Sequence, residues 1–248
     1  MSFVYKPPTE WIPPDVFPTE LLCQAKEIAI DLETRDPNLK ELGPGYIRGD
    51  GEAVGISFAI DGYENYFPFA HESGFNFSKK KVLEFTKKVC ATDSDKIFHN
   101  STYDIGWLSH HDIPVEGRII DTMIVAPLID ENQFWFSLNA LGREYVNEGK
   151  SEGELKEAAE EWGLDPKADM WRLPSAYVGT YATQDAALTL KLWNHFKILL
   201  EEQNLWNIFD LEMKVLPVVL AMKQEGVRVD RERAESLKLQ LVKREKKI

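Results

Sequence analysis

The sequence is short of cysteine and has no long apolar run. Its two cysteines, Cys23 and Cys90, form no C-x-x-C pair, which favours a reduced, intracellular environment. No run approaches the ~18 apolar residues of a membrane span, so we expect no transmembrane helix and no membrane partner. The Pro-rich N-terminus is unlike a signal or transit peptide, and we expect residues 1–26 to form an extended arm.

Several common nucleotide and metal motifs are also missing. Gly43-Pro44-Gly45 has Arg48 where a G-x-G-x-x-G fingerprint needs glycine, so no dinucleotide site is indicated. His71-Glu72 has Phe75 where H-E-x-x-H needs its second histidine. No P-loop pattern occurs either. These absences exclude the simplest dehydrogenase, zinc protease and P-loop interpretations.

Positive charge is in short supply. Lys and Arg total 29 against 41 Asp and Glu, a formal net charge of −12, which argues against a protein that coats nucleic acid by charge alone. An enzyme that grips a chain end through metal ions and a local basic patch is still compatible with this balance. With 248 residues, 44% of them hydrophobic, the chain can form one large α/β domain, alone or with an appendage.

The order of the expected elements indicates the fold class. Strands are followed by strand–helix alternation and then by helices, which predicts a mixed α/β sheet flanked by helices. A three-stranded antiparallel meander is expected first, with a turn at Asp61-Gly62. Expected strands cover 27–34, 53–60, 64–69, 96–98 and 119–120. Expected helices cover 78–89, 100–110, 174–201, 206–224 with an interruption at Pro217, and 230–248, and a capping box at 151–154 begins another that stops at Gly163.

Two carboxylates stand at the end of the first expected strand. Asp31 and Glu33 project to the same side, roughly 6.5–7 Å apart along the chain. Such a pair is a good anchor for hard divalent cations, which prefer oxygen ligands. The alternative is a solvated strand end with two surface acids.

Two further acids occur with polar partners at helical spacing. Asn100 and Asp104 are four residues apart after a strand, and Tyr181 and Asp185 have the same spacing on an otherwise apolar helix. Each acid alone could be an exposed helix carboxylate. Four acids on three inward-looking segments are hard to explain as surface decoration.

Together these three blocks resemble the Exo I, Exo II and Exo III motifs of the DEDD 3′–5′ exonuclease superfamily, which has a ribonuclease H-like fold. The resemblance spans about residues 27–200. The histidine branch would place His at position 180, where this chain has Thr180, so Tyr181 indicates the tyrosine branch. Asp121-Thr122-Met123 resembles a connecting segment of this branch, and we expect Asp121 to make structural hydrogen bonds and to bind no metal.

Residues 209–230 are similar to the segment that leads into the polymerase domain of family A DNA polymerases, and the loop at 36–59 looks like phage-type members. An ordinary amphipathic helix is the alternative for 209–230. We therefore expect an exonuclease domain at 27–203 and, at 204–248, the helical start of a polymerase domain or an appendage. The chain would be an excised domain, a split polymerase subunit or a solitary exonuclease, in the cytoplasm of a bacterial cell or phage-infected host.

The resemblance implies a metal-dependent mechanism of phosphodiester hydrolysis. Asp31, Glu33 and Asp185 would hold one divalent ion with the attacking water, and Asp31 would bridge to a second ion assisted by Asp104. Mg²⁺ is expected, with Mn²⁺ able to substitute, and Tyr181 would orient the water. Nucleoside 5′-monophosphates would leave one at a time from a single-stranded DNA 3′ end, as in proofreading.

Candidate substrate-binding residues follow from the same interpretation. Phe134, Trp135 and Phe136 could stack on bases or, about as readily, fill the core. Leu39 could wedge between terminal bases, the backbone at Thr34 could approach the 3′ nucleotide, and Asn100 could contact substrate. Two other functions stay open: a ribonuclease D-like RNA 3′-trimming enzyme, and an inactive exonuclease-like scaffold of a polymerase.

Overall fold

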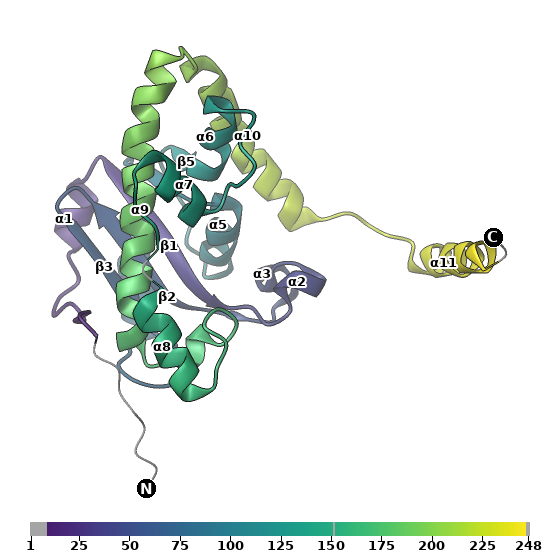
Figure 1. The fold of residues 1–248 in the computed structure, drawn as a ribbon, viewed down its shortest axis with the longest axis horizontal. Coiled ribbons are helices and arrows are strands. Elements are labelled where there is room, and N and C mark those ends of the chain that lie inside the picture. The colour runs from purple at the N-terminus through teal and green to yellow at the C-terminus, as the bar shows by residue number, and fades with distance from the viewer. Residues whose placement is uncertain (1–8, 151, 247–248) are drawn as a thin grey trace, which may run out of the picture.

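The computed structural model describes residues 9–150 and 152–246. In that part of the chain the centre is a five-stranded mixed sheet with strand order β3-β2-β1-β4-β5 (Figure 1). The strands are β1 (Glu27–Arg35), β2 (Glu52–Ile60), β3 (Tyr63–Pro68), β4 (Asp95–Phe98) and β5 (Ile119–Asp121). β1, β2 and β3 form an antiparallel meander, and β4 and β5 continue the sheet in parallel. The predicted mixed α/β sheet is confirmed.

Helices surround this sheet. They are α1 (Thr19–Gln24), α2 (Leu39–Leu42), α3 (Gly45–Arg48), α4 (Lys79–Cys90), α5 (Ser101–His110), α6 (Thr122–Ile129), α7 (Leu138–Tyr145), α8 (Gly153–Trp162), the 3₁₀ turn η1 (Met170–Arg172), α9 (Ser175–Glu202), α10 (Trp206–Glu225) and α11 (Arg231–Glu245). None of the helices so described is both long and apolar enough to cross a membrane.

The central strand β1 separates two apolar cores because its side chains alternate between the faces of the sheet. Ile28 and Ile30 belong to the core that also contains Phe85 of α4. Ala29, on the other face, belongs to the core that contains Ala186 of α9. Figure 1 shows the long helix α9 running across this second face. The face of β1 that carries Asp31 and Glu33 is therefore the face that α9 covers.

The extended arm expected over residues 1–26 is wrong in its second half. Residues 1–8 lie outside the described part, but residues 19–24 form α1, because Leu22 is fully buried in the core beside α4. Before α1, Trp11 fixes the chain to the domain through a hydrogen bond from its Nε1 to Asn65 Oδ1 at 3.0 Å. The Trp11 ring packs directly against Gly179 of α9, so any larger side chain at position 179 would collide with the ring.

Two further expectations concern helix ends. The helix expected to be interrupted at Pro217 is continuous from Trp206 to Glu225. Proline removes one backbone hydrogen bond and normally breaks a helix, but Leu216 on one side and Leu220 on the other are packed against the cores and hold both halves in place. The expected stop at Gly163 is confirmed, with φ +64°. Ser151 of the expected capping box lies outside the described residues.

The C-terminal segment differs from the rest of the molecule. Leu216 is the last buried residue, and every described residue from 221 onward is exposed. Figure 1 shows α11 standing apart from the sheet and its helices.

Candidate active site

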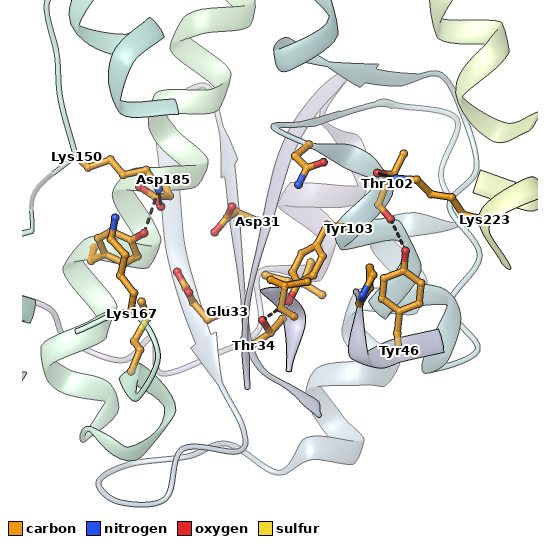
Figure 2. Close-up of a pocket in the computed structure, with 16 residues that line it drawn as sticks. Asp31, Glu33, Thr34, Tyr46, Thr102, Tyr103, Lys150, Lys167, Asp185 and Lys223 are labelled. Carbon is orange, nitrogen blue, oxygen red and sulfur yellow. Dashed lines mark hydrogen bonds and ion pairs between the residues drawn. The ribbon is translucent and has the colours of Figure 1, made fainter. Parts of the chain in front are cut away.

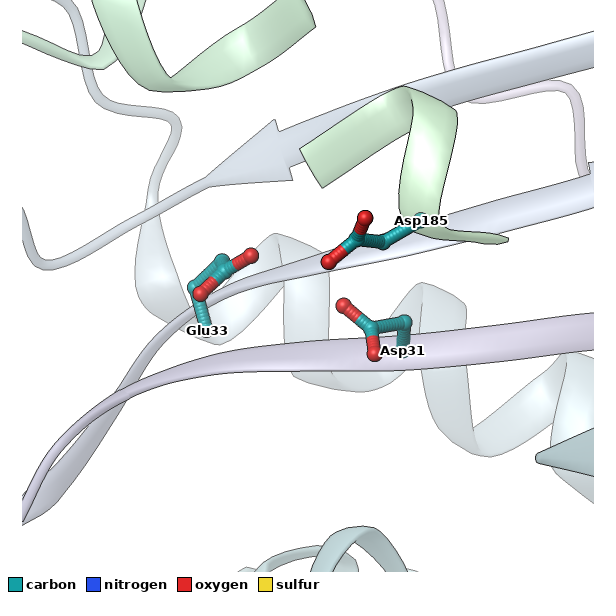
Figure 3. Close-up of side chains that lie close together, drawn as sticks. All are labelled: Asp31, Glu33 and Asp185. Atoms are coloured by element: carbon teal, nitrogen blue, oxygen red, sulfur yellow. The ribbon is translucent and has the colours of Figure 1, made fainter. Parts of the chain in front are cut away.

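Three carboxylates from two elements meet above the sheet. Asp31 and Glu33 project from β1, and Asp185 projects from α9, which crosses that face (Figure 3). One oxygen from each carboxylate lies within 4.8 Å of the others. The two-residue spacing on a strand and the helix that covers it are thus sufficient to build the cluster.

These acids repel one another at a site where Glu33 and Asp185 are buried and Asp31 is partly buried. Burial, followed by the charge of Asp185, raises the pKa of Asp31 to about 7. Burial, followed by the charges of Asp31 and Asp185, raises the pKa of Glu33 well above its ordinary value. The Oδ1 atom of Asp185 is buried and has no hydrogen-bond partner within the described residues. Oxygen donors, converging charge and an unpartnered buried oxygen fit a hard divalent cation.

Asp104 lies next to this cluster without being one of its three members. It is 4% exposed on α5, and its Oδ1 accepts a hydrogen bond from the backbone N–H of Leu32 at 3.1 Å. Burial, followed by the charge of Asp31, raises its pKa well above the ordinary value. The Asp104 carboxylate is therefore fixed to the backbone of β1 at Leu32, the residue between the two acids of the first motif.

Tyr181 lies one helical turn before Asp185 and is 8% exposed. Burial, followed by the charges of Glu33, Asp185 and Asp31, raises its pKa well above 10, so the phenol keeps its proton at neutral pH. Its hydroxyl faces the Asp185 carboxylate. A protonated phenol at this place can orient a water molecule but cannot act as the base.

Lys150 is a residue of the site for which the sequence gave no expectation. Its Nζ donates a hydrogen bond to the Tyr181 hydroxyl oxygen at 3.0 Å and forms an ion pair with Asp185. Burial alone would lower the pKa of Lys150, but the charges of Asp185, Asp31 and Glu33 outweigh burial and raise it. Its position 31 residues before Tyr181, in a loop, matches no periodic pattern. The one indication in the sequence was the set of inward-facing acids, whose negative charges need a positive charge nearby.

The acids open into a pocket of about 470 Å³ (Figure 2). Among the candidate substrate residues, Thr34, Leu39 and Asn100 line it. Phe134 and Trp135 do not, and they are 87% and 75% exposed. Phe136 packs partly buried against the core beneath α9. The structure therefore separates the three consecutive aromatics into two exposed rings and one packed ring.

Several pocket residues were not expected from the sequence. They are Tyr46, Thr102, Tyr103, Lys167, Met170 and Lys223. Tyr103 fixes one wall, because its hydroxyl lies 2.8 Å from Thr34 Oγ1, just after a register shift in β1 between Glu33 and Thr34. Lys223 of α10 donates to Thr102 Oγ1 at 3.0 Å, so α10 borders the pocket on the side opposite Lys150 (Figure 2).

Asp121 is a fourth buried acid near this edge of the sheet, and it has a different environment. Its carboxylate accepts hydrogen bonds from Asn100 N at 3.0 Å, Ser101 N at 2.7 Å, Ser101 Oγ at 2.7 Å and Met123 N at 2.9 Å. These bonds hold the start of α5 against the start of α6. The expected structural role of Asp121 is confirmed.

A profile of the 3′–5′ exonuclease family found in family A DNA polymerases matches residues 18–201. The chain belongs to this family. The DNA-directed DNA polymerase of Pseudomonas phage M6 is 37% identical over 234 residues, which are 92% of this chain and 35% of the phage protein. DNA polymerase DpoZ of Salmonella phage PMBT28 is 29% identical over 84% of this chain and 32% of its own length. The chain thus spans about a third of these relatives.

Solved structures share the fold at low sequence identity. The polymerase domain of Pol1 from M. smegmatis, in complex with DNA primer-template and dNTP, has a TM-score of 0.62 and 15% identity over 90% of this chain and 33% of its own. Brucella melitensis NrnC with bound Mg²⁺ has a TM-score of 0.58 and 19% identity over 84% of this chain and 90% of its own. Escherichia coli RNase D, an exoribonuclease, has a TM-score of 0.56 and 15% identity over 85% and 48%.

Proposed function

We propose that this exonuclease removes nucleoside 5′-monophosphates one at a time from the 3′ end of single-stranded DNA, as in proofreading. The observation that carries the proposal is the cluster of Asp31, Glu33 and Asp185 beside Tyr181, all of which line one pocket. DNA is favoured over RNA because the relatives that match most of the chain are DNA polymerases.

Two divalent ions, Mg²⁺ or Mn²⁺ in its place, complete the proposed site. Asp31, Glu33 and Asp185 would hold one ion, and Asp31 and Asp104 would hold the second. When bound, such ions acidify a water molecule and neutralise charge on the phosphate that is cleaved. The chain itself contributes the arrangement of the acids and the neutral Tyr181 hydroxyl, which donates a hydrogen bond toward the attacking oxygen.

The pocket walls position the terminal nucleotide in this proposal. Thr34, held by Tyr103, places strand backbone beside the 3′ nucleotide, and Leu39 and Asn100 close the pocket around it. Phe134 and Trp135 stack on bases further from the 3′ end, because exposed rings are free to do so. Phe136 supports them from the core.

Degradation of a 5′-labelled DNA oligonucleotide and its RNA copy tests this function. A ladder of shortening DNA in Mg²⁺ or Mn²⁺ is expected, absent with EDTA and absent in the Asp31→Ala/Glu33→Ala variant. RNA cut faster than DNA would replace the proposal with a ribonuclease D-like function. A folded chain that cuts neither substrate would point to a scaffold, or to a domain that is active only with a polymerase.

The C-terminal segment is proposed to contact a polymerase domain or subunit. Residues 27–203 form the exonuclease in this proposal, and 204–248 lead to the partner. Leu237, Leu239 and Leu241 of α11 are more than half exposed, as is Val227 before it, and the phage relative is about three times as long as its match to this chain. Exposed apolar side chains in such number are typical of a surface that another protein covers.

Co-expression with the polymerase portion of the phage M6 relative tests this contact. The unchanged chain is expected to co-purify, and Leu237→Glu/Leu241→Glu is expected to abolish co-purification without affecting cleavage of a short oligonucleotide. Equal capture of both versions would count against α11 as the contact surface.

A further inference from the structure

Lys150 contacts two of the most important groups in the pocket at once. Its ammonium hydrogen-bonds to the Tyr181 oxygen at 3.0 Å, pairs with Asp185 and lies 5.0 Å from the centre of the Tyr181 ring (Figure 2). Its side chain is 18% exposed. A lysine this well covered has a fixed position, unlike the exposed lysines that are usual on a protein surface.

The loop that carries Lys150 is anchored to two helices, α7 and α9. The backbone N–H of Lys150 donates to Asn139 Oδ1 of α7 at 3.0 Å. The carbonyl of Gly149 accepts a hydrogen bond from Gln184 Nε2 of α9 at 3.0 Å, one residue before Asp185. The backbone is therefore tied to the same helix that carries Tyr181. These two hydrogen bonds hold the loop in the position from which the Lys150 ammonium reaches the Tyr181 hydroxyl.

The chemistry of the two groups fixes the direction of their hydrogen bond. An ammonium has three donors and no acceptor, whereas a phenol oxygen can both accept and donate. Since Lys150 must donate, the Tyr181 oxygen accepts, and the single hydrogen of Tyr181 is left to point toward the carboxylates. That is the direction in which an attacking water has to lie under the proposed function.

We propose that Lys150 is a positioning residue, which holds the Tyr181 hydroxyl as a donor toward the attacking water. The inference rests on the proposed exonuclease function. Two other roles make different predictions. A simple counter-ion for the acids needs positive charge and does not need Tyr181, and a phosphate contact changes substrate binding more than turnover.

Steady-state kinetics on a short DNA oligonucleotide separate these roles. Lys150→Met is expected to lower kcat by about tenfold to a hundredfold, the usual scale for a residue that orients a group at a metal site, with KM little changed. In a Tyr181→Phe background the same substitution is expected to lower kcat by less than about threefold, because coupled residues do not act additively. Lys150→Gln, which keeps an N–H donor without the charge, should retain more activity than Lys150→Met.

Lys191→Met is the matched control. Lys191 also joins α9 to the loop before Lys150, through an exposed ion pair with Glu148 at 2.7 Å, but lies outside the pocket lining. Its removal is expected to leave kcat unchanged. An equal loss from Lys150→Met in both backgrounds would overturn the inference, as would a loss confined to KM, or Lys150→Arg active with Lys150→Gln as weak as Lys150→Met.

An NMR measurement without metal or DNA tests the contact itself. In protein labelled with ¹³C at tyrosine Cζ, the signal missing from Tyr181→Phe is assigned to Tyr181. We expect this signal to move in Lys150→Met and to stay in Lys191→Met. A signal that stays in both variants would overturn the inference even where cleavage is intact. A chain that cleaves no DNA, alone or with a polymerase, would instead refute the proposed function, and the NMR result would still report the contact.

Discussion

Two sets of buried acids lie near the same edge of the sheet, and the protein treats them in opposite ways. Asp121 is 1% exposed and accepts hydrogen bonds from three backbone N–H groups and one hydroxyl. The donors belong to the first turns of α5 and α6 and to the residue before α5, where free N–H groups favour a negative charge. The polypeptide alone therefore satisfies this acid.

The cluster of Asp31, Glu33 and Asp185 receives no comparable support. Burial and repulsion within the cluster raise the pKa values of Asp31 and Glu33, and burial raises the pKa of Asp185. Asp185 Oδ1 has no hydrogen-bond partner within the described residues. Lys150 provides positive charge through its ion pair with Asp185. Glu33 and Asp185 are buried like Asp121, and Asp31 is partly buried, so burial does not distinguish a structural acid from a functional one. The distinction lies in whether the fold provides the donors.

Removing the charge of the cluster should have the largest effect and should separate activity from stability. Asp31→Asn/Glu33→Gln is expected to lower the cleavage rate by at least roughly 10²–10³-fold, the loss seen when one preorganised electrostatic group is removed. In EDTA the same variant should melt at the same or a higher temperature than the unchanged chain, because buried like charges are gone. Gel-based kinetics and thermal melting check both parts. A clear fall in melting temperature would show that the acids stabilise the fold.

The pH dependence of stability should carry the same sign. The pKa of Asp31 is about 7 in the folded chain and ~3.9 in an unfolded one, so between these values the folded state binds more protons. Stability in EDTA is therefore lost as pH rises from 4 to 7, by on the order of 2–4 kcal/mol for a carboxylate that is partly open to the pocket.

Urea unfolding at pH 5 and pH 8 measures this effect as a difference between two chains. His71 and His99, with pKa values lowered to about 4 by burial, destabilise the fold as pH falls from 6.5 to 4. Their contribution is common to the unchanged chain and to Asp31→Asn/Glu33→Gln, and it cancels in the difference. The variant's stability advantage should be larger at pH 8. An advantage that is equal at both pH values would contradict the raised pKa values.

Local sequence patterns were sufficient for the sheet and for the acids. The alternation along β1 puts Asp31 and Glu33 on one face, and the four-residue spacing puts Tyr181 and Asp185 on one side of α9, whatever the rest of the chain does. These relations are set within a few residues, so they can be read before the fold is known.

Contacts between distant segments were not predictable in this way. Lys150 reaches Tyr181 only because its loop is tied to both α7 and α9. Pro217 stays inside a helix because Leu216 and Leu220 are packed on both sides of it. All three residues at 134–136 are aromatic, so residue type does not show which of them face solvent. Only tertiary packing decides this.

Asp121→Asn should give a smaller effect of the opposite kind. An amide retains one acceptor oxygen but turns an NH₂ group toward N–H donors, so buried donors lose their partner. The free energy of unfolding is expected to fall by about 1–3 kcal/mol. Urea unfolding in EDTA measures this loss, and Asp31→Asn/Glu33→Gln is unfolded under the same conditions for comparison. Unfolding at the same urea concentration as the unchanged chain would mean that the hydrogen bonds to Asp121 are not what stabilises the helix starts.

The smallest expected effects apply the same distinction to side chains that carry no charge. The Trp135 ring is exposed and available to stack on a base, whereas Phe136 is packed against the core beneath α9. Trp135→Ala should leave the melting temperature within experimental error. It should weaken binding of a single-stranded oligonucleotide by up to about tenfold, the low end for loss of one base–aromatic stack. Phe136→Ala should do the reverse and lower stability, since truncating even a partly buried ring removes packing.

Fluorescence anisotropy with a labelled oligonucleotide in Ca²⁺ or EDTA, beside thermal melting, measures both quantities without turnover. Phe134→Ala, at the most exposed of the three rings, is the second test of stacking and should behave like Trp135→Ala. If Phe136→Ala weakened DNA binding while leaving stability unchanged, a packed side chain would be acting as a binding residue. The rule drawn from Asp121 and the three-acid cluster, that groups already satisfied by the fold are structural, would then hold for carboxylates and fail for aromatic rings.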